Sequence, residues 1–330
     1  RFQRGCVGCA KRSRRDTYAL DRYPLALGYL AAVVRRITDW RARAYNADFQ
    51  PRSEPIRVSY LTERGFTDYL NSLGDLSMPI WNEVANVVRD EQPDVLGISA
   101  KSQNFASARN VARIAKQINP GIKVVVGGPH PSMVGAEVLR CGDIDVAVRG
   151  EGERTLVEVL NVLQTGGSLA GVNGICYRSA AGECVETPPR ELLRDLDTLP
   201  FPHEVAAEVL RDYSAHPPEA FGFVFSSRGC PRDCFFCGSR EIWSRRVRLR
   251  SPDNIIQEIQ RLQQHGVRAV DFVDDIFGVH SSHLKEVCRG LREQCPGLIW
   301  SCETHPAFVE DETVAVMASS GCTAIRLGVE

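Results

Sequence analysis

The chain contains 330 residues and is nearly neutral, with 40 Lys or Arg against 41 Asp or Glu and a formal net charge of −1. Because proteins that bind polyanions carry a basic excess, this balance argues against nucleic acid as a partner. No apolar run is long enough for a membrane span, and no secretory signal is visible. The length exceeds what one hydrophobic core usually holds, so it predicts two domains.

Strand and helix patterns alternate over residues 1–165, which we interpret as a first α/β domain. The predicted strands are continuous apolar runs, as expected where helices cover both faces of a sheet. The alternation therefore predicts a doubly wound parallel sheet of the Rossmann or flavodoxin type. The expected strands are 55–61, 94–99, 122–126 and 144–148, and the expected helices are 23–35, 80–90, 103–118 and 154–164.

Three loops follow predicted strands at the edge where such sheets bind ligands. They are Ser99–Ser102, Gly127–Gly128 and Gly150–Gly152. Their glycines would let a ligand approach the backbone, and the helix N-termini that follow suit a phosphate group. Ordinary strand-to-helix turns explain the same glycines equally well, so the pattern alone leaves both interpretations open.

Residues 166–220 are predicted to form a connector. Two strand-like runs at 174–178 and 183–186 flank a Ser-Ala-Ala-Gly turn and predict a hairpin. The Pro-rich segment Leu196–Pro202 predicts an extended strap between the domains.

Residues 221–330 resume the alternation and are predicted to form the second domain. Four β/α units indicate a TIM-like barrel, complete or partial. The expected strands are 221–225, 269–277, 298–303 and 323–330, and the expected helices are 253–265, 281–294 and 311–319.

Charged residues stand at notable positions in this second domain. Asp274, Asp275 and Glu330 lie near strand ends, where such barrels place their chemistry. Because adjacent strand residues point to opposite faces, only one of the two aspartates can face the interior. The basic runs Lys11–Arg15 and Arg245–Arg250 favour solvated loops over phosphate sites.

Twelve cysteines are spread over the chain, whereas disulfide scaffolds concentrate theirs in short secreted domains. This dilution favours a reducing, cytoplasmic setting. Cys6 and Cys9 have C-x2-C spacing without a partner pair, so a metal site is disfavoured there. Cys302 and Cys322 are expected to be packing residues. The chain starts without Met and stops where a strand ends, which is typical of a fragment of a longer protein.

The three cysteines Cys230, Cys234 and Cys237 form the only tight cluster, with C-x3-C-x2-C spacing between Gly229 and Gly238. So short a loop can turn three thiolates toward one point, because the two glycines let its backbone bend. Three thiolates are one fewer than the set that saturates a [4Fe–4S] cluster, so one iron would stay open. A zinc knuckle or three buried thiols are the alternatives, although zinc would normally require a fourth ligand nearby.

This spacing, the Phe236 before the last cysteine and the preceding strand resemble the radical S-adenosylmethionine (SAM) superfamily. The resemblance implies a [4Fe–4S] cluster on the three cysteines, with SAM bound at the open iron and cleaved to a 5′-deoxyadenosyl radical on reduction. It also implies an external electron donor of the flavodoxin or ferredoxin type. The positions that would face SAM or the substrate are Phe236, Asp274, Asp275 and Glu330.

Further motifs resemble the cobalamin-binding (B12-binding) class of radical SAM proteins, in the same order along nearly the whole chain. These motifs lie at 24–32, 127–131, 150–153 and 199–202. No D-x-H-x-x-G occurs, so the usual histidine below the cobalt has no counterpart, and His130 in its tight turn is interpreted as structural. The residues that the resemblance places against cobalamin are Ser99, Ser102, Gly127, Gly128, Gly150, Glu151 and Gly152.

The resemblance implies a cobalamin-dependent radical SAM enzyme, with C-methylation of an unactivated carbon in a small molecule or peptide as the favoured reaction. Radical ring closure or rearrangement with the same cofactors is the alternative reaction. A sensor or carrier that binds SAM or cobalamin without turnover is a rival from another class. A methylthiotransferase fits less well, because its first domain should carry three cysteines for a second cluster.

Overall fold

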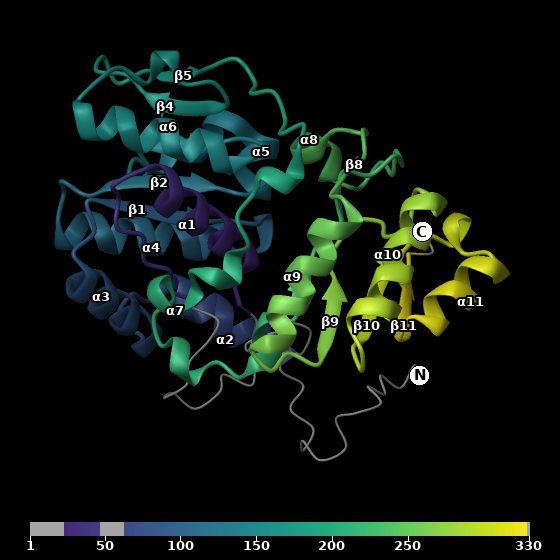
Figure 1. Cartoon of the computed structure of the whole chain (residues 1–330). Coiled ribbons are helices and arrows are strands. Elements are labelled where there is room, and N and C mark those ends of the chain that lie inside the picture. Colours follow the sequence, from purple (N-terminus) through teal and green to yellow (C-terminus); the bar gives the residue numbers. More distant parts are fainter. Residues whose placement is uncertain (1–22, 47–62, 329–330) are drawn as a thin grey trace.

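The computed structural model describes residues 23–46 and 63–328 (Figure 1). Several predicted features lie outside the described residues: the strand 55–61, the run Lys11–Arg15, the pair Cys6 and Cys9, and Glu330. Among the helices that are described, none combines the length and apolar character needed to cross a membrane.

The first sheet contains five strands in the order β1-β2-β3-β4-β5. Its parallel part consists of β1 (Val95–Ser99), β2 (Lys123–Gly127) and β3 (Val146–Val148). The predicted hairpin is present as β4 (Ile175–Arg178) and β5 (Cys184–Glu186), and β4 pairs antiparallel with β3. The hairpin therefore belongs to the first sheet.

Helices cover both faces of this sheet, as a doubly wound fold requires. The helices described in this domain are α1 (Leu25–Ile37), α2 (Glu63–Gly74), α3 (Pro79–Glu91), α4 (Phe105–Ile118), α5 (Pro129–Val134) and α6 (Gly152–Thr165). Val124 and Val126 of β2 belong to a core with α4, whereas Val125 between them belongs to a core with Val159 of α6. Successive strand residues point to opposite faces, so an unbroken apolar run serves both cores.

The second sheet contains four parallel strands in the order β11-β10-β9-β6. They are β6 (Phe223–Val224), β9 (Ala269–Phe272), β10 (Ile299–Thr304) and β11 (Cys322–Leu327), joined through α9 (Pro252–Gln264), α10 (Ser281–Gln294) and α11 (Asp311–Ser319). Phe272, Trp300 and Cys302 are buried in its core, the last as predicted for a packing cysteine. The four predicted strands and the three helices between them are present in the described residues.

Two strands of this sheet are shorter than predicted. β6 follows a 3₁₀ turn at Pro218–Phe221 and has two residues, and β9 ends at Phe272 instead of residue 277. The N–H of Ser226, which could have extended the pairing, donates to both carboxylate oxygens of Asp274, at 3.1 and 3.0 Å. A buried carboxylate therefore replaces strand pairing at this point.

A two-stranded antiparallel ribbon carries the three cysteines. Its strands are β7 (Ser227–Arg228) and β8 (Arg248–Leu249), and residues 229–247 between them are here called the cysteine loop. The loop contains α8 (Ser239–Trp243), and a further short helix, α7 (Ala206–Val209), lies in the connector. In Figure 1, α8 and β8 lie at the junction between α5 of the first domain and the second sheet.

Candidate functional site

The cysteine loop begins at a position that only glycine can occupy without strain. Gly229 has a φ of 102°, and a Cβ there would overlap the carbonyl group of Arg246. Further along, the N–H of Cys237 donates to the carbonyl oxygen of Cys234 at 3.0 Å, which closes the turn between these two cysteines. Cys230 and Cys234 are half-buried, and Cys237 is exposed.

The surroundings of Cys230 disfavour its thiolate form. Burial raises the pKa of the Cys230 thiol, the backbone N–H of Arg232 opposes this, and Asp275 and the other two cysteines raise that pKa further. A thiol must lose its proton to bind a metal, and the positive charge of the metal favours that loss. Three thiols on one loop are the donor set that iron–sulfur clusters use.

Within residues 23–46 and 63–328, no group of three or more His, Cys, Asp or Glu side chains is arranged to hold one metal ion. A [4Fe–4S] cluster sets a different requirement, because each cysteine ligates its own iron of the cube. The residues therefore fit the cluster by their chemistry and by their position on one short loop.

Asp274, the first of the two predicted acids, is buried and fully engaged with the start of the ribbon. Its carboxylate accepts hydrogen bonds from the N–H and hydroxyl of Ser226 and from the hydroxyl of Ser227, at 2.5–3.1 Å. Burial raises the pKa of Asp274 to about 6, although these hydrogen bonds lower it. Asp274 therefore fixes the backbone that leads into β7.

Asp275, the second acid, adjoins the cysteines. Its carboxylate accepts a hydrogen bond from Ser239 Oγ of α8 at 2.6 Å. Burial raises the pKa of Asp275 and this hydrogen bond lowers it, and Asp275 in turn raises the pKa of Cys230. The two neighbours contact different partners, although both lie beyond the end of β9, so strand alternation does not set their directions.

Phe236 lies on the exposed tip of the cysteine loop together with Phe235. Their side chains are 57% and 92% exposed, and their rings meet edge to face with centroids 5.4 Å apart. Exposed aromatic pairs commonly mark a surface that contacts a ligand or partner. The place of Phe236 beside adenine stays a prediction.

At the carboxyl edge of the first sheet, two consecutive glycines have different surroundings. A Cβ at Gly127 would meet only Val148, at 3.8 Å, so there is room at the end of β2. Gly128 has a φ of 101°, and a Cβ there would lie 2.9 Å from the carbonyl oxygen of Ala100. Gly128 is therefore required by the fold, whereas Gly127 leaves space at the edge, where Ser99 is also exposed.

Ser102 and His130 contact each other across this edge. Ser102 Oγ lies 3.1 Å from His130 Nδ1, and the His130 ring packs on Phe105 with centroids 4.1 Å apart. Burial lowers the pKa of His130. These contacts hold the ring against the start of α4, and its structural role stays a prediction.

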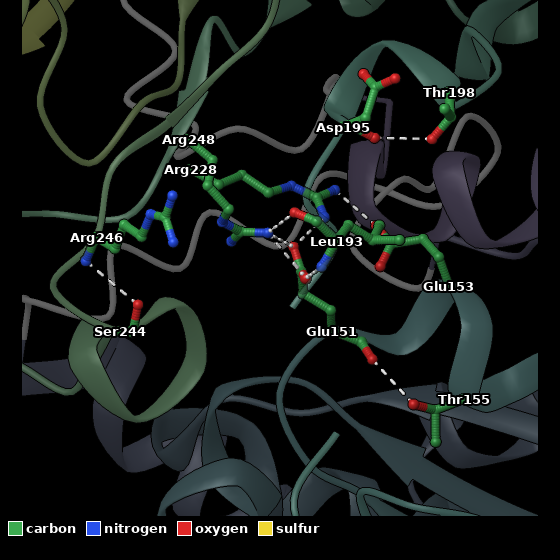
Figure 2. Close-up of polar contacts among 10 residues, drawn as sticks. All are labelled: Glu151, Glu153, Thr155, Leu193, Asp195, Thr198, Arg228, Ser244, Arg246 and Arg248. Atoms are coloured by element: carbon green, nitrogen blue, oxygen red, sulfur yellow. Dashed lines mark hydrogen bonds and ion pairs between the residues drawn. The ribbon is translucent and has the colours of Figure 1, made fainter. Parts of the chain in front are cut away.

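The third predicted loop is divided between the sheet edge and the domain junction. Gly150 has a φ of 70° and faces the carbonyl oxygen of Ile242 in α8. Gly152 packs against Leu30 of α1. The carboxylate of Glu151 is buried and bound to arginines of the β7–β8 ribbon (Figure 2), so its side chain is directed to the second domain.

The edge of the first sheet and the cysteine loop meet in direct contact. At Gly238, which follows Cys237, a Cβ would lie 2.5 Å from the Sδ atom of Met133 in α5. Gly150 also contacts α5, because its N–H donates to Ser132 Oγ at 2.9 Å. The cysteine loop therefore meets α5 in one interface beside Cys237.

Sequence comparison agrees with this geometry. A family profile described as the B12 binding domain matches residues 12–160, and a profile described as the radical SAM superfamily matches residues 224–330. The chain is a B12-binding-domain radical SAM protein. The radical SAM match covers the cysteine loop and the second sheet, and the B12-binding match covers the three loops at the edge of the first sheet.

Known relatives include two kinds of enzyme. An uncharacterized methyltransferase of Pyrococcus horikoshii is 30% identical over 76% of this chain and 54% of its own length. The anaerobic magnesium-protoporphyrin IX monomethyl ester cyclase of Rubrivivax gelatinosus is 28% identical over 83% of this chain and 50% of its own length. This radical SAM chain thus spans about half the length of these curated relatives.

The fold has a counterpart among solved structures. The radical SAM methyltransferase TsrM from Kitasatospora setae, solved with cobalamin and a [4Fe–4S] cluster, matches with a TM-score of 0.68. The match covers 96% of this chain and 57% of that chain at 16% identity. It supports the two-domain α/β fold of this radical SAM protein.

Sequence reasoning missed the arginines of the ribbon. The run Arg245–Arg250 was predicted to be a solvated loop, which is wrong for Arg248 and Arg250, because both are buried. Arg245 and Arg246 are exposed. Residues two apart in an extended segment share a face, so the spacing of Arg248 and Arg250 could have indicated a common buried side.

Proposed function

We propose that this chain is the cofactor-binding part of a cobalamin-dependent radical SAM C-methyltransferase. The observation that carries the proposal is the contact of α5 and Gly150 with the cysteine loop, through Gly238 and Ile242. A ligand at the edge of the first sheet and a cluster on the cysteines would face each other across this interface. Such closeness suits chemistry that uses both cofactors on one substrate.

In this proposal Cys230, Cys234 and Cys237 hold a [4Fe–4S] cluster and leave one iron for SAM. When bound, the cluster with SAM supplies a carbon-centred radical and cobalamin supplies the methyl group. Asp275 and Ser239 hold α8 beside Cys230, and their hydrogen bond orients that side of the loop. The exposed Phe236 would cover the adenine side of SAM and help to exclude water.

The edge of the first sheet would hold cobalamin. The space beside Gly127 and the exposed Ser99 would accept its nucleotide tail, while Gly128 and Gly150 keep the backbone close. Ser102 is bonded to His130, so its hydroxyl would contribute only if that pair opens. Glu151 and Gly152 would contribute through backbone position, since Glu151 binds arginines and Gly152 packs on α1.

The reaction type is supported by the relatives, which include methyltransferases acting on several compounds and also a ring cyclase. Methyl transfer is favoured because these relatives include several different methyltransferases but one kind of cyclase. Ring closure with the same cofactors is the second candidate. A small-molecule or peptide substrate, a flavodoxin or ferredoxin donor and a cytoplasmic location complete the proposal.

The fate of the methyl group tests the proposal. Full-length protein, reduced and supplied with cobalamin and methyl-labelled SAM, is expected to form both S-adenosylhomocysteine and 5′-deoxyadenosine. The first product reports transfer of the methyl group, and the second reports radical formation at the cluster. Replacing Cys234 by Ala should abolish formation of 5′-deoxyadenosine. Replacing Gly127 by Leu should abolish formation of S-adenosylhomocysteine, because the leucine would fill the space at the edge of the first sheet.

The outcomes separate the candidates. Deoxyadenosine alone, with cobalamin still required, would replace methyl transfer by ring closure or rearrangement. Binding of SAM and cobalamin without either product would identify a sensor or carrier.

A further inference from the structure

Four charged side chains form a buried cluster where the first domain meets the cysteine loop (Figure 2). They are Glu151, Glu153, Arg228 and Arg248, here called the junction quartet. The glutamates come from the start of α6, and the arginines face each other across the β7–β8 ribbon. None of the four residues is more than 9% exposed.

Glu151 is the centre of the junction quartet. Its carboxylate accepts hydrogen bonds from Arg228 Nη1 at 2.8 Å, from Arg248 Nη1 at 2.9 and 3.0 Å, and from the N–H of Leu193 at 2.6 Å. Arg228 Nη2 donates to Glu153 at 2.6 Å. One guanidinium therefore bridges both carboxylates, in the forked geometry that arginine provides and lysine lacks.

The junction quartet balances two positive against two negative charges. Buried charges are tolerated only when they are paired, and loss of one partner is strongly destabilising. Arg228 also packs on aromatic rings, with its Cζ atom 4.8 Å from the Phe225 centroid and 5.0 Å from the Trp243 centroid. Trp243 ends α8, so Arg228 contacts both Phe225, which precedes the ribbon, and the helix of the cysteine loop.

The junction quartet lies next to both ends of the cysteine loop in the sequence. Arg228 precedes Cys230 by two residues, and Arg248 directly follows the cysteine loop, so both ends of the loop are tied to the start of α6. On the other side, Gly150 precedes Glu151 at the edge where cobalamin is proposed to bind. The hydrogen bonds of the junction quartet therefore connect the segments that carry the two proposed cofactor sites.

We propose that the junction quartet positions the cysteine loop against the edge of the first sheet, so that ordering one of them favours ordering of the other. The inference rests on the proposed function for the identity of the two ligands. It also gives a reason for the Gly-Glu-Gly-Glu sequence at 150–153, since both glutamates serve the arginines of the second domain.

Amide hydrogen exchange of the ligand-free, full chain tests the positioning role without turnover. Glu153→Gln keeps the side-chain shape and removes its charge, and Arg228→Lys keeps the charge and removes the fork. In both variants, amides of residues 229–247 are expected to exchange about tenfold faster than in the wild type. If Arg228→Lys fails to fold, the isosteric Glu153→Gln decides alone.

Arg250→Lys is the matched control. Arg250 is as deeply buried and pairs with Glu258 at 2.5 Å, but both residues belong to the second domain. We expect amides of the cysteine loop in this variant to stay within about twofold of the wild type. Equal exchange of the loop in the wild type and in Glu153→Gln would overturn the positioning role, as would equal acceleration in the Arg250→Lys control.

Ligand loading tests the coupling itself. Reconstitution with iron and sulfide should slow exchange at residues 150–155, and added cobalamin should slow exchange at residues 229–247, because coupling is reciprocal. Both effects should disappear in Arg228→Lys and persist in Arg250→Lys. Persistence in Arg228→Lys would overturn the coupling. Failure of the wild type to bind iron or cobalamin, seen by metal analysis and absorbance, would overturn the proposed function instead, since the ligand-free comparison involves neither ligand.

Discussion

The two loops that meet at the domain junction are built in different ways. The edge of the first sheet is packed against its own domain: Gly128 lies on the backbone of Ala100, and the His130 ring lies on Phe105. The cysteine loop instead exposes Phe235 and Cys237, and its only helix spans Ser239–Trp243. We therefore expect a preformed cradle on one side and, on the other, a loop that is ordered by its base and by the proposed cluster.

The largest effect is expected from replacing the three cysteines of the cysteine loop. Replacing Cys230, Cys234 and Cys237 together by Ala should reduce the iron content of anaerobically reconstituted protein from about four per chain to none. Iron analysis and absorbance near 400 nm measure the change. Replacing Cys288 or Cys295, both buried in the second core, should leave iron binding intact. Loss of iron in these controls would show that other thiols hold the cluster.

The preformed side can be tested through its two adjacent glycines. Gly128→Ala forces a side chain into a φ of 101° and against the Ala100 carbonyl, so it should destabilise the iron-free protein by about 2 kcal/mol or more. Gly127→Ala has room and should cost less than about 1 kcal/mol. Denaturant midpoints followed by circular dichroism compare the two. Similar midpoints for both variants would contradict the picture of a tightly packed cradle.

The connector supplies a pH-dependent test of packing away from both loops. The side chain of His203 is 6% exposed, and burial, followed by His265, Arg261 and Arg250, lowers its pKa to about 4. The unfolded chain takes up this proton near pH 6.5, so stability present above that pH is lost as the pH falls toward 4. The wild type should therefore lose about 2 kcal/mol more than His203→Phe between pH 7 and pH 5. Parallel pH profiles of unfolding would show that His203 is not held neutral.

The smallest expected effect concerns the exposed tip of the cysteine loop. Phe235→Ser should change the free energy of unfolding of the iron-free protein by no more than about 0.5 kcal/mol, because the ring is 92% exposed. Phe272→Ala is the contrasting variant and should cost about 3–5 kcal/mol, since Phe272 is fully buried. A large effect of Phe235→Ser would mean that the tip is packed, and the two loops would then differ less than described.

Much of the fold could be predicted because its signals are local. The apolar run at Val124–Val126 serves two cores, and it predicts a strand covered on both faces. The end of β9 could not be predicted, since it depends on Ser226, which is distant in sequence and binds Asp274. The hairpin at 175–186 was predicted, but its pairing with β3 is a matter of topology.

The candidate site likewise has a part that the sequence predicts and a part that it does not. The spacing of the three cysteines lies within one loop, so the sequence alone indicated the kind of metal centre. The roles of Asp274 and Asp275 became distinct only in the structure, where one holds Ser226 and Ser227 and the other contacts α8. Adjacent acids have identical local patterns, and only their tertiary partners separate them.

The sequence by itself determined the two α/β domains, the three-cysteine loop and the family resemblance, because these depend on spacing and periodicity within short segments. Only the tertiary structure decided that Glu151 binds Arg228 and Arg248, and that Met133 lies against Gly238 beside the third cysteine. Charges far apart in sequence become buried partners only when two domains pack, since a buried charge must find its counterpart wherever the fold places it.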